Sequence, residues 1–502
     1  MNKTGLLSIF IFFLFCRCTD VDEKVYDKYD AAEFYASAEG SDAALASVYA
    51  QLPGNWDGVG YAGADNGWYD LNCMSSDEQV VPHRNTGDWQ LDFARLYLRE
   101  WLPSDYIVTN TWNWLYKSVY LANLAIDQLE TANADPSKIA EVKVLRAFFY
   151  SLLIDDYGNV PFYTENTMSV DQIPQVSRKE VFDFVVSELK DNIESLPSTK
   201  GGDYYGRFNK WAGYALLAKL YLNAEVYTGT AMWSECIDAC DKIINDGGFS
   251  LHSGDADASN ELGYRYYELF GDQCPDDETI LAIYTTVDVV GRNIFTIRSL
   301  GGTDGTLMMG YSGWNGTVVP QDYIEKFDEN DIRKRQFRYG ADPYGPQPSG
   351  FINYSLEITN LDNPGADRNA GARNIKFWPA GDMNSGGASN DFPIYRYADI
   401  LLMKAECLVR TNQAGDARAY VDQIRERAGL NALASDPTLE DVYHERGFEL
   451  SWEGHRRQDM IRFGTFIKAH GLAPAADSHF RLFPIPTDAL NANKNLIQNT
   501  GY

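Results

Sequence analysis

A run of charged side chains between Glu445 and Asp459 is the part of the sequence most suggestive of catalysis. It combines carboxylates with arginines and His455, and two carboxylates beside such groups could transfer protons. These residues lie on one helical stretch, however, at spacings that favour ion pairs within and between helices. A pair of catalytic carboxylates would instead have to face each other across a cleft. We therefore predict a structural ion-pair network and no catalytic residues.

The sequence offers little support for a metal or cofactor site. The six histidines are mostly isolated, and no Cys-x-x-Cys pair with zinc spacing occurs. The acidic stretch 328–331 lacks the twelve-residue pattern of a calcium loop. The glycines of 301–305 lack the strand–loop–helix setting that cradles phosphate. We expect neither a metal nor a cofactor.

Composition and charge narrow the class of protein. The chain has 502 residues, enough for one large domain or two to three ordinary ones, and 14% of them are aromatic. Such an aromatic content suits a large helical core or a surface that stacks on rings. The net charge of −28 argues against nucleic acid and against adhesion to anionic lipid. An acidic surface is compatible with neutral ligands such as sugars.

The N-terminus carries the features of an export signal. Lys3 precedes an apolar run that ends at Phe15, which is too short to span a bilayer but suits a secretory signal. Cys16 and Cys18 follow, and a cysteine at this point indicates lipoprotein processing. We favour Cys18 as the lipidated residue, because the acidic, polar segment 19–23 after it resembles a tether. Residues 1–17 are then the signal peptide.

Helical periodicity divides the rest of the chain into blocks. Apolar residues recur at helical spacing in two regions, about 103–248 and 391–502. Within the first region, Ser177 and Glu180 form a capping-box pattern that predicts the start of a helix. The regions of about 52–102 and 249–390 are rich in Gly, Asp, Asn, Tyr and Trp. Long irregular stretches of this kind are commonly functional. We predict a helical scaffold that presents loops.

Six segments, in order along the chain, resemble signatures of the SusD/RagB family. One such segment would be weak support, whereas six in sequence are specific. They are Cys18–Tyr26, Arg146–Tyr150 with Asp156–Pro161, Arg207–Leu222, Pro393–Glu406, Glu445–Arg456 with Asp459 and Arg462–Gly464, and Phe483–Pro486 with Asn495–Tyr502.

The resemblance implies both a fold and a function. It implies an all-α fold over residues 18–502, built on tetratricopeptide-like helix pairs with a loop-rich variable half. Members sit on the outer face of the outer membrane, held by a lipid anchor. They bind oligosaccharides or polysaccharides and act as the lid of a SusC-like TonB-dependent transporter. Companion enzymes carry out hydrolysis, so the resemblance implies a binding protein and no enzyme.

The signature helices are expected to hold the scaffold. Phe149 and Tyr150 should pack between helices, and Arg146 should pair with an acid or cap a carbonyl. Ligand capture is expected in the loops instead. Sugar rings stack on Trp and Tyr through their C–H faces, and their hydroxyls bind Asp, Asn and Arg.

The candidate ligand-binding residues combine this chemistry with the resemblance. The segment around Trp89 resembles a region that carries a stacking Trp in some members, and Trp314 sits where the variable half usually contributes its own ring. We predict Trp89 and Trp314 as a stacking pair with Tyr311 as a third ring. Further candidates are Asp88, Asn66, Trp68 and Arg373. The alternative is that each Trp packs inward to anchor its own loop.

Two other functions remain open from the sequence. The protein could be a lid that binds peptides or other non-glycan nutrients. Less favoured is a surface glycosidase, which would release products steadily from a glycan.

Overall fold

The computed structural model describes residues 31–502, except 55–58, 85–88, 288, 341–349, 363–367 and 380. The predictions for the signal peptide, Cys16 and Cys18, and for the site residue Asp88, therefore lie outside the described residues. Within the described part of the chain, no helix combines the length and the apolar character needed to cross a membrane.

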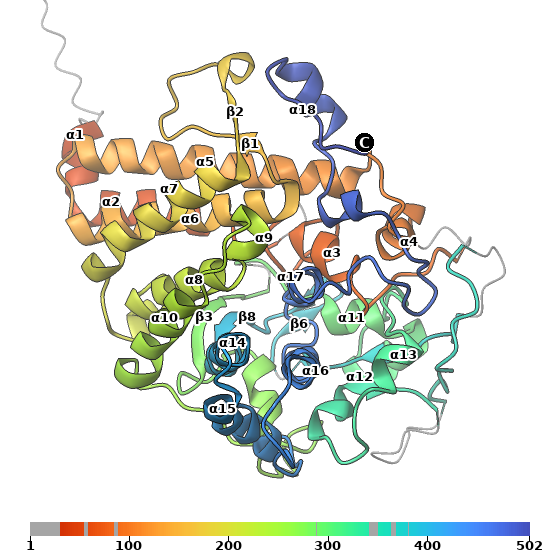
Figure 1. Ribbon diagram of the computed structural model, residues 1–502. Helices are drawn as coiled ribbons and strands as arrows, with labels where there is room; N and C mark the ends of the chain where they lie inside the picture. The colour runs from red at the N-terminus through yellow and green to blue at the C-terminus, as the bar shows by residue number, and fades with distance from the viewer. Residues whose placement is uncertain are drawn as a thin grey trace, which may run out of the picture.

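A curved array of packed helices forms one side of the molecule (Figure 1). α5 packs on α6, α6 on α7, α8 on α10, α10 on α14, and α14 on both α15 and α16, while α2 lies across α5 and α6. The expectation of an all-α fold is confirmed. The bounds are α2 (Ala38–Tyr49), α5 (Tyr106–Thr131), α6 (Pro136–Tyr157), α7 (Arg178–Asn192), α8 (Lys210–Leu222), α10 (Trp233–Asp246), α14 (Tyr397–Arg410), α15 (Ala414–Arg427) and α16 (Leu439–Glu449).

Local chemistry sets the ends of these helices. α6 begins after Asp135, whose carboxylate accepts a hydrogen bond from Ser137 N at 2.9 Å. It stops at Gly158, whose φ of +75° suits a residue without Cβ. α7 opens with the predicted capping box, in which Ser177 Oγ accepts from Glu180 N at 3.2 Å.

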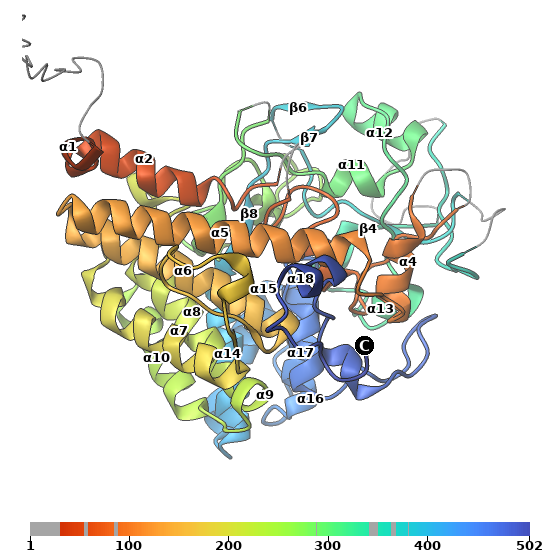
Figure 2. The same ribbon diagram turned by 90° about the horizontal axis from the view of Figure 1, so that it is seen from above.

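The other side of the molecule consists of loops, short helices and small ladders (Figures 1 and 2). Among the residues described between 249 and 390, no helix exceeds the eight residues of α12. The short helices there are η4 (Arg265–Phe270), α11 (Phe295–Ser299), α12 (Gly302–Met309), α13 (Gln321–Ile324) and η5 (Ile332–Gln336). Elsewhere they are α1 (Ala31–Ala36), α3 (Trp68–Cys73), α4 (Leu91–Leu98), α9 (Ala224–Thr228), α17 (Arg456–Arg462), α18 (Thr487–Ala492), η1 (Val170–Gln172), η2 (Ile193–Ser195), η3 (Gly202–Tyr204) and η6 (Ser478–Arg481).

One buried ladder joins the two sides. β3 (Thr279–Ile283) pairs antiparallel with β8 (Phe392–Arg396), and every residue of both strands is buried. α14 follows β8 directly, so the ladder links the loop-rich side to the helical array. The other ladders have two residues in each strand: β1 (Val160–Pro161) with β2 (Gln175–Val176), β4 (Phe337–Arg338) with β5 (Arg373–Asn374), and β6 (Met383–Asn384) with β7 (Gly387–Ala388).

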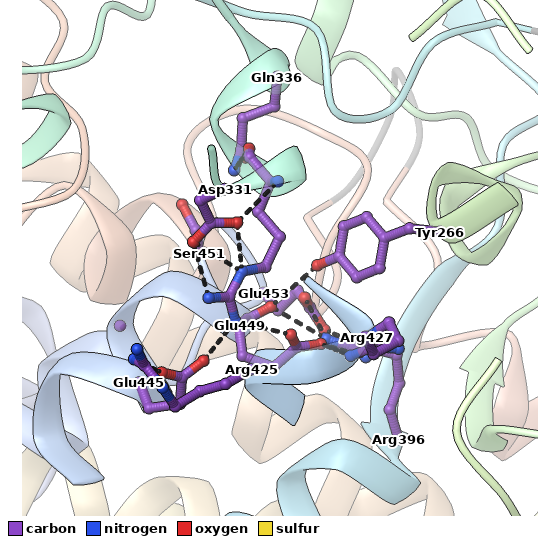
Figure 3. A network of polar contacts seen from close by, with 12 residues as sticks. Tyr266, Asp331, Gln336, Arg396, Arg425, Arg427, Glu445, Glu449, Ser451 and Glu453 are labelled. Atoms are coloured by element: carbon purple, nitrogen blue, oxygen red, sulfur yellow. Dashed lines mark hydrogen bonds and ion pairs between the residues drawn. The ribbon is translucent and has the colours of Figure 1, made fainter. Parts of the chain in front are cut away.

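The charged run of α16 and the turn after it forms a buried ion-pair network (Figure 3). Arg396, at the end of β8, contacts Glu453 at 2.7 Å and Glu449 at 3.0 Å. Arg333 of η5 contacts Glu445 at 2.7 Å and Glu449 at 3.1 Å. These side chains come from the helical array and from the loop-rich side. The predicted structural ion-pair network is therefore confirmed, and it joins the two sides.

Candidate ligand-binding surface

The first predicted stacking residue, Trp89, lies mostly inside the protein, with 9% of its surface exposed. Its indole N–H donates to the main-chain carbonyl of Trp314 at 3.3 Å, and its ring meets Phe93 edge-on at 5.5 Å. Gly316 lies so close that an added Cβ would sit 2.5 Å from the indole. Trp89 therefore takes the inward-packing alternative and supports the segment that carries Trp314.

Trp314 itself is half-buried and keeps part of its ring toward solvent. Its main-chain N–H donates to Ile297 O at 2.8 Å, which ties the segment to α11. Tyr311, three residues earlier, is 37% exposed. The guanidinium of Arg292 lies 6.0 Å from the centre of the Trp314 ring. An indole, a phenol and a cation thus lie around one segment.

Trp68 and Arg373 face the interior, so the expectation that they contact a ligand is corrected. Trp68 is 2% exposed and stacks on Tyr61 with ring centres 4.0 Å apart. Arg373 is fully buried, donates to Asn315 Oδ1 at 2.7 Å and lies 4.1 Å from the centre of the Tyr354 ring. Their neighbours occupy the surfaces that a sugar would need. Arg373 instead fixes the residue next to Trp314.

Asn66 is half-buried, and its polar groups are used within the protein. Its Oδ1 accepts from Tyr106 OH at 2.7 Å, and its N–H donates to Asp70 at 2.7 Å. A φ of +69° places it in the left-handed region, which asparagine tolerates well. Asn66 therefore shapes the turn before α3.

Arg292 is the residue that sequence reasoning missed. Burial lowers its pKa, and the carboxylate of Asp65 acts in the opposite direction. Gly63, with φ of +97°, lies against the Arg292 carbonyl so closely that a Cβ would overlap it. This contact brings the loop that bears Asp65 beside Arg292. Arg292 is a single arginine in an irregular segment, and nothing in the sequence around it indicates that it lies near Trp314 and Asp65.

We call Trp314, Tyr311, Arg292 and Asp65 the Trp314 surface. Arg292 is buried, with 5% of its surface exposed, so the more open groups are the two aromatic side chains and Asp65. An aromatic ring can cover the C–H face of a sugar, while a carboxylate can bind its hydroxyls. The arrangement therefore suits a neutral, polyhydroxylated ring.

The charged run of α16 does not contribute to this surface. Burial and the neighbouring Lys219 lower the pKa of His455 to about 3, so the imidazole is neutral at pH 7. Glu445 and Glu453 are buried in ion pairs with Arg333 and Arg396. In the described part of the chain, no group of three or more His, Cys, Asp or Glu side chains is arranged to hold a metal ion.

The signature helices act as scaffold, as predicted. Arg146 pairs with Glu188 and donates to the Thr164 carbonyl at 3.0 Å. Phe149 and Tyr150 are fully buried in the helical core. Their roles are structural, and both predictions are confirmed.

Comparison with known proteins identifies the family. A model described as the SusD family matches residues 352–474, and one described as starch-binding and associating with the outer membrane matches residues 59–222. The chain is 24% identical to the starch-binding protein SusD of Bacteroides thetaiotaomicron over 82% of each chain. It is 25% identical to a SusD-like protein of Formosa agariphila over 99% of each. This chain belongs to the SusD family.

Solved structures share its fold. A SusD-like protein from Bacteroides fragilis superposes with a TM-score of 0.76 at 20% identity, covering 95% of this chain and 99% of that one. The surface glycan-binding protein A of Bacteroides thetaiotaomicron, in complex with laminarihexaose, superposes with a TM-score of 0.69 at 22% identity, covering 92% and 99%.

Proposed function

We propose that this protein captures glycan chains at the cell surface and delivers them to a SusC-like TonB-dependent transporter of the outer membrane. The observation that carries the proposal is the Trp314 surface, where a half-buried indole lies near Arg292, with the exposed Tyr311 three residues earlier in the chain and Asp65 close enough to act on Arg292. Two relatives add support, because one is named as starch-binding and another was solved with laminarihexaose.

The proposal includes attachment to the outer membrane through a lipid on Cys18. The support is the position of this cysteine after an apolar signal, together with a matching family model described as associating with the outer membrane. Metabolic labelling with radioactive palmitate tests it. Wild-type protein should take up label, and Cys18→Ala should not. Uptake by Cys18→Ala but not by Cys16→Ala would assign the lipid to Cys16 instead.

A binding panel tests glycan capture. Protein expressed from Thr19 onward is titrated with starch, laminarin, xylan, arabinan, pectin and levan, and binding is followed by calorimetry and affinity gels. We expect at least one polysaccharide to bind, and Trp314→Ala to weaken that binding. Tyr120→Ala, an exposed tyrosine on α5, is the matched control. Failure of every polysaccharide to bind, with binding of peptides instead, would favour the peptide lid.

We also infer that the protein does not cleave its ligand. The carboxylates of the charged run are held in buried ion pairs, and the relatives above are named for binding. Chain length is measured after prolonged incubation of the bound polysaccharide with protein. An unchanged length is expected, whereas steady product release would identify a glycosidase.

Delivery requires contact with the transporter. Wild-type protein, solubilised from outer membranes of its own cells, should co-purify with a TonB-dependent transporter. Absence of any transporter from this preparation, under conditions that keep other outer-membrane complexes intact, would contradict the delivery step.

A further inference from the structure

A second groove lies between α2 and the end of β3, outside the residues that the sequence singled out. Its volume is about 470 Å³, within the range of roughly 300 to 1,000 Å³ that is usual for small-molecule sites. Tyr284, directly after β3, is 52% exposed at its edge. We call it the α2 groove; its walls include Leu45, Tyr49, Pro53, Arg207, Tyr284 and Val290.

The groove pairs an open aromatic ring with polar groups. Arg207 lines it and is held in place, because its Nε and Nη2 donate to Glu141 at 3.0 and 2.6 Å. Asp42, from α2, brings an exposed carboxylate to the same groove. Apart from Tyr49, the remaining walls are aliphatic or glycine. This combination matches a pyranose, which has C–H faces to stack and hydroxyls to bind.

A short stretch of chain, Val290 to Arg292, links the α2 groove to the Trp314 surface. Val290 lines the groove, and Arg292, two residues later, lies beside Trp314. Gly291 between them packs on Pro53, where an added Cβ would lie 2.5 Å from the proline ring.

The hairpin that carries Tyr284 is anchored to the segment between β7 and β8. Thr285 N donates to Asp391 Oδ1 at 2.7 Å, and Val287 N donates to Ser389 Oγ at 3.1 Å. Thr286 and Val290 pair across the hairpin. The groove is therefore preformed, and a ligand would not have to order it on binding.

We infer that the α2 groove binds a second part of the same glycan chain that lies on the Trp314 surface, so that the protein selects long chains over short ones. The inference rests on the proposed function. Short oligosaccharides reach only the Trp314 surface, whereas longer ones also stack on Tyr284. Affinity should therefore rise with chain length until both sites are filled.

A length series tests the inference. Oligosaccharides from disaccharide to decasaccharide are prepared from the polysaccharide that binds best in the panel, and each is titrated by calorimetry. We expect Tyr284→Ala to weaken binding of the longest members about tenfold and to leave the shortest unchanged. Trp314→Ala should weaken every length. Tyr120→Ala, at 48% exposure on α5, should change none.

The outcomes separate this inference from the proposed function. A wild-type affinity that is independent of length overturns the inference, as does a Tyr284→Ala effect that is absent or equal at all lengths. Binding of an apolar peptide that Tyr284→Ala abolishes, with glycan affinity intact, also overturns it and leaves glycan capture standing. If no polysaccharide of the panel binds, the proposed function fails and the inference fails with it.

Discussion

The indole N–H of Trp89 donates to the main-chain carbonyl of Trp314 at 3.3 Å, and the two residues are 225 positions apart in the sequence. This contact joins the two loop-rich regions. It also gives the two tryptophans different roles, because the ring of Trp89 is covered while that of Trp314 is partly open. The two tryptophans are predicted to stack on a ligand together. In the structure Trp89 supports the segment of Trp314, and only Trp314 remains a candidate for stacking.

These roles predict different effects of the two alanine variants. Trp89→Ala should lower the free energy of unfolding by about 3–5 kcal/mol, because it empties a packed site. Trp314→Ala should lower it by about 1–2 kcal/mol, since only part of that ring is buried. Urea unfolding measures both free energies. Glycan titration should show that Trp314→Ala binds more weakly than wild type although the variant is fully folded.

Trp89→Phe is the companion variant, since it keeps most of the buried volume and removes the N–H donor. It should lose less stability than Trp89→Ala. Equal unfolding free energies for Trp89→Ala and wild type would contradict the supporting role.

Gly63 holds the loop of Asp65 against Arg292, and its substitution should disturb the candidate surface. In Gly63→Ala the new Cβ would overlap the Arg292 carbonyl, and φ of +97° disfavours any side chain. We expect a loss of more than about 2 kcal/mol in unfolding free energy. Glycan affinity should fall as well, because Arg292 must move.

The matched control is Gly229→Ala, which also has a positive φ of +78° but meets no atom within 4 Å. It should lose only about 1 kcal/mol and keep full affinity. Equal losses in the two variants would show that backbone strain alone, without the contact to Arg292, explains the effect.

Arg298 and Asp70 form a buried ion pair beneath the candidate surface, with 2.8 Å between Nη1 and Oδ1 and both side chains fully covered. Burial raises the pKa of Asp70, and Arg298 opposes this rise. Arg298→Met leaves the carboxylate without its cation and should lower the unfolding free energy by about 3–5 kcal/mol.

The double variant Arg298→Met with Asp70→Asn removes both charges and should recover part of this loss. A double-mutant cycle measures the recovery. If the loss in the double variant equals the sum of the two single losses, the interaction between Arg298 and Asp70 contributes nothing to the free energy of unfolding.

Asp391, which accepts from Thr285 in the hairpin of the α2 groove, should make stability depend on pH. Burial raises its pKa from 3.8 to about 7, and Asp272 adds to the rise. Between these values the folded state holds a proton that the unfolded state lacks. The free energy of unfolding should therefore fall as pH rises through this window, by up to about 4 kcal/mol.

Asp391→Asn cannot ionise, so this part of the pH dependence should vanish in the variant. Urea unfolding at several pH values from about 4 to about 8 gives the difference between the two proteins. The free energy of unfolding of the wild type should fall further below that of Asp391→Asn as pH rises. Parallel curves would contradict the raised pKa.

The buried thiols should be unreactive in the native protein. Burial raises the pKa of each described cysteine above its ordinary value, and only the thiolate reacts quickly. Protein expressed from Thr19 onward should react with DTNB only after unfolding in guanidinium. The thiols concerned are Cys73, Cys236, Cys240, Cys274 and Cys407. A rapid native reaction would place at least one of them at the surface.

The sequence was informative wherever the structure is locally determined. Asp135 caps the start of α6 and Gly158 ends it. The capping box of Ser177 and Glu180 starts α7, as predicted. The spacing of charges in α16 also predicted ion pairs, although their partners, such as Arg396 on β8, come from distant segments. Helical periodicity is a property of neighbouring residues, so it can be read without the fold.

The tertiary structure alone decided which loop side chains remain open. Trp68 and Trp314 occur in similar Gly- and Asn-rich contexts, yet Trp68 is covered by Tyr61 while Trp314 keeps part of its ring exposed. Irregular segments have no period that assigns their residues to a face. Their burial depends on segments hundreds of residues away, as Trp89 beneath Trp314 illustrates. The sequence by itself therefore determined the family and the helical scaffold, and the packing of distant loops determined the candidate surface.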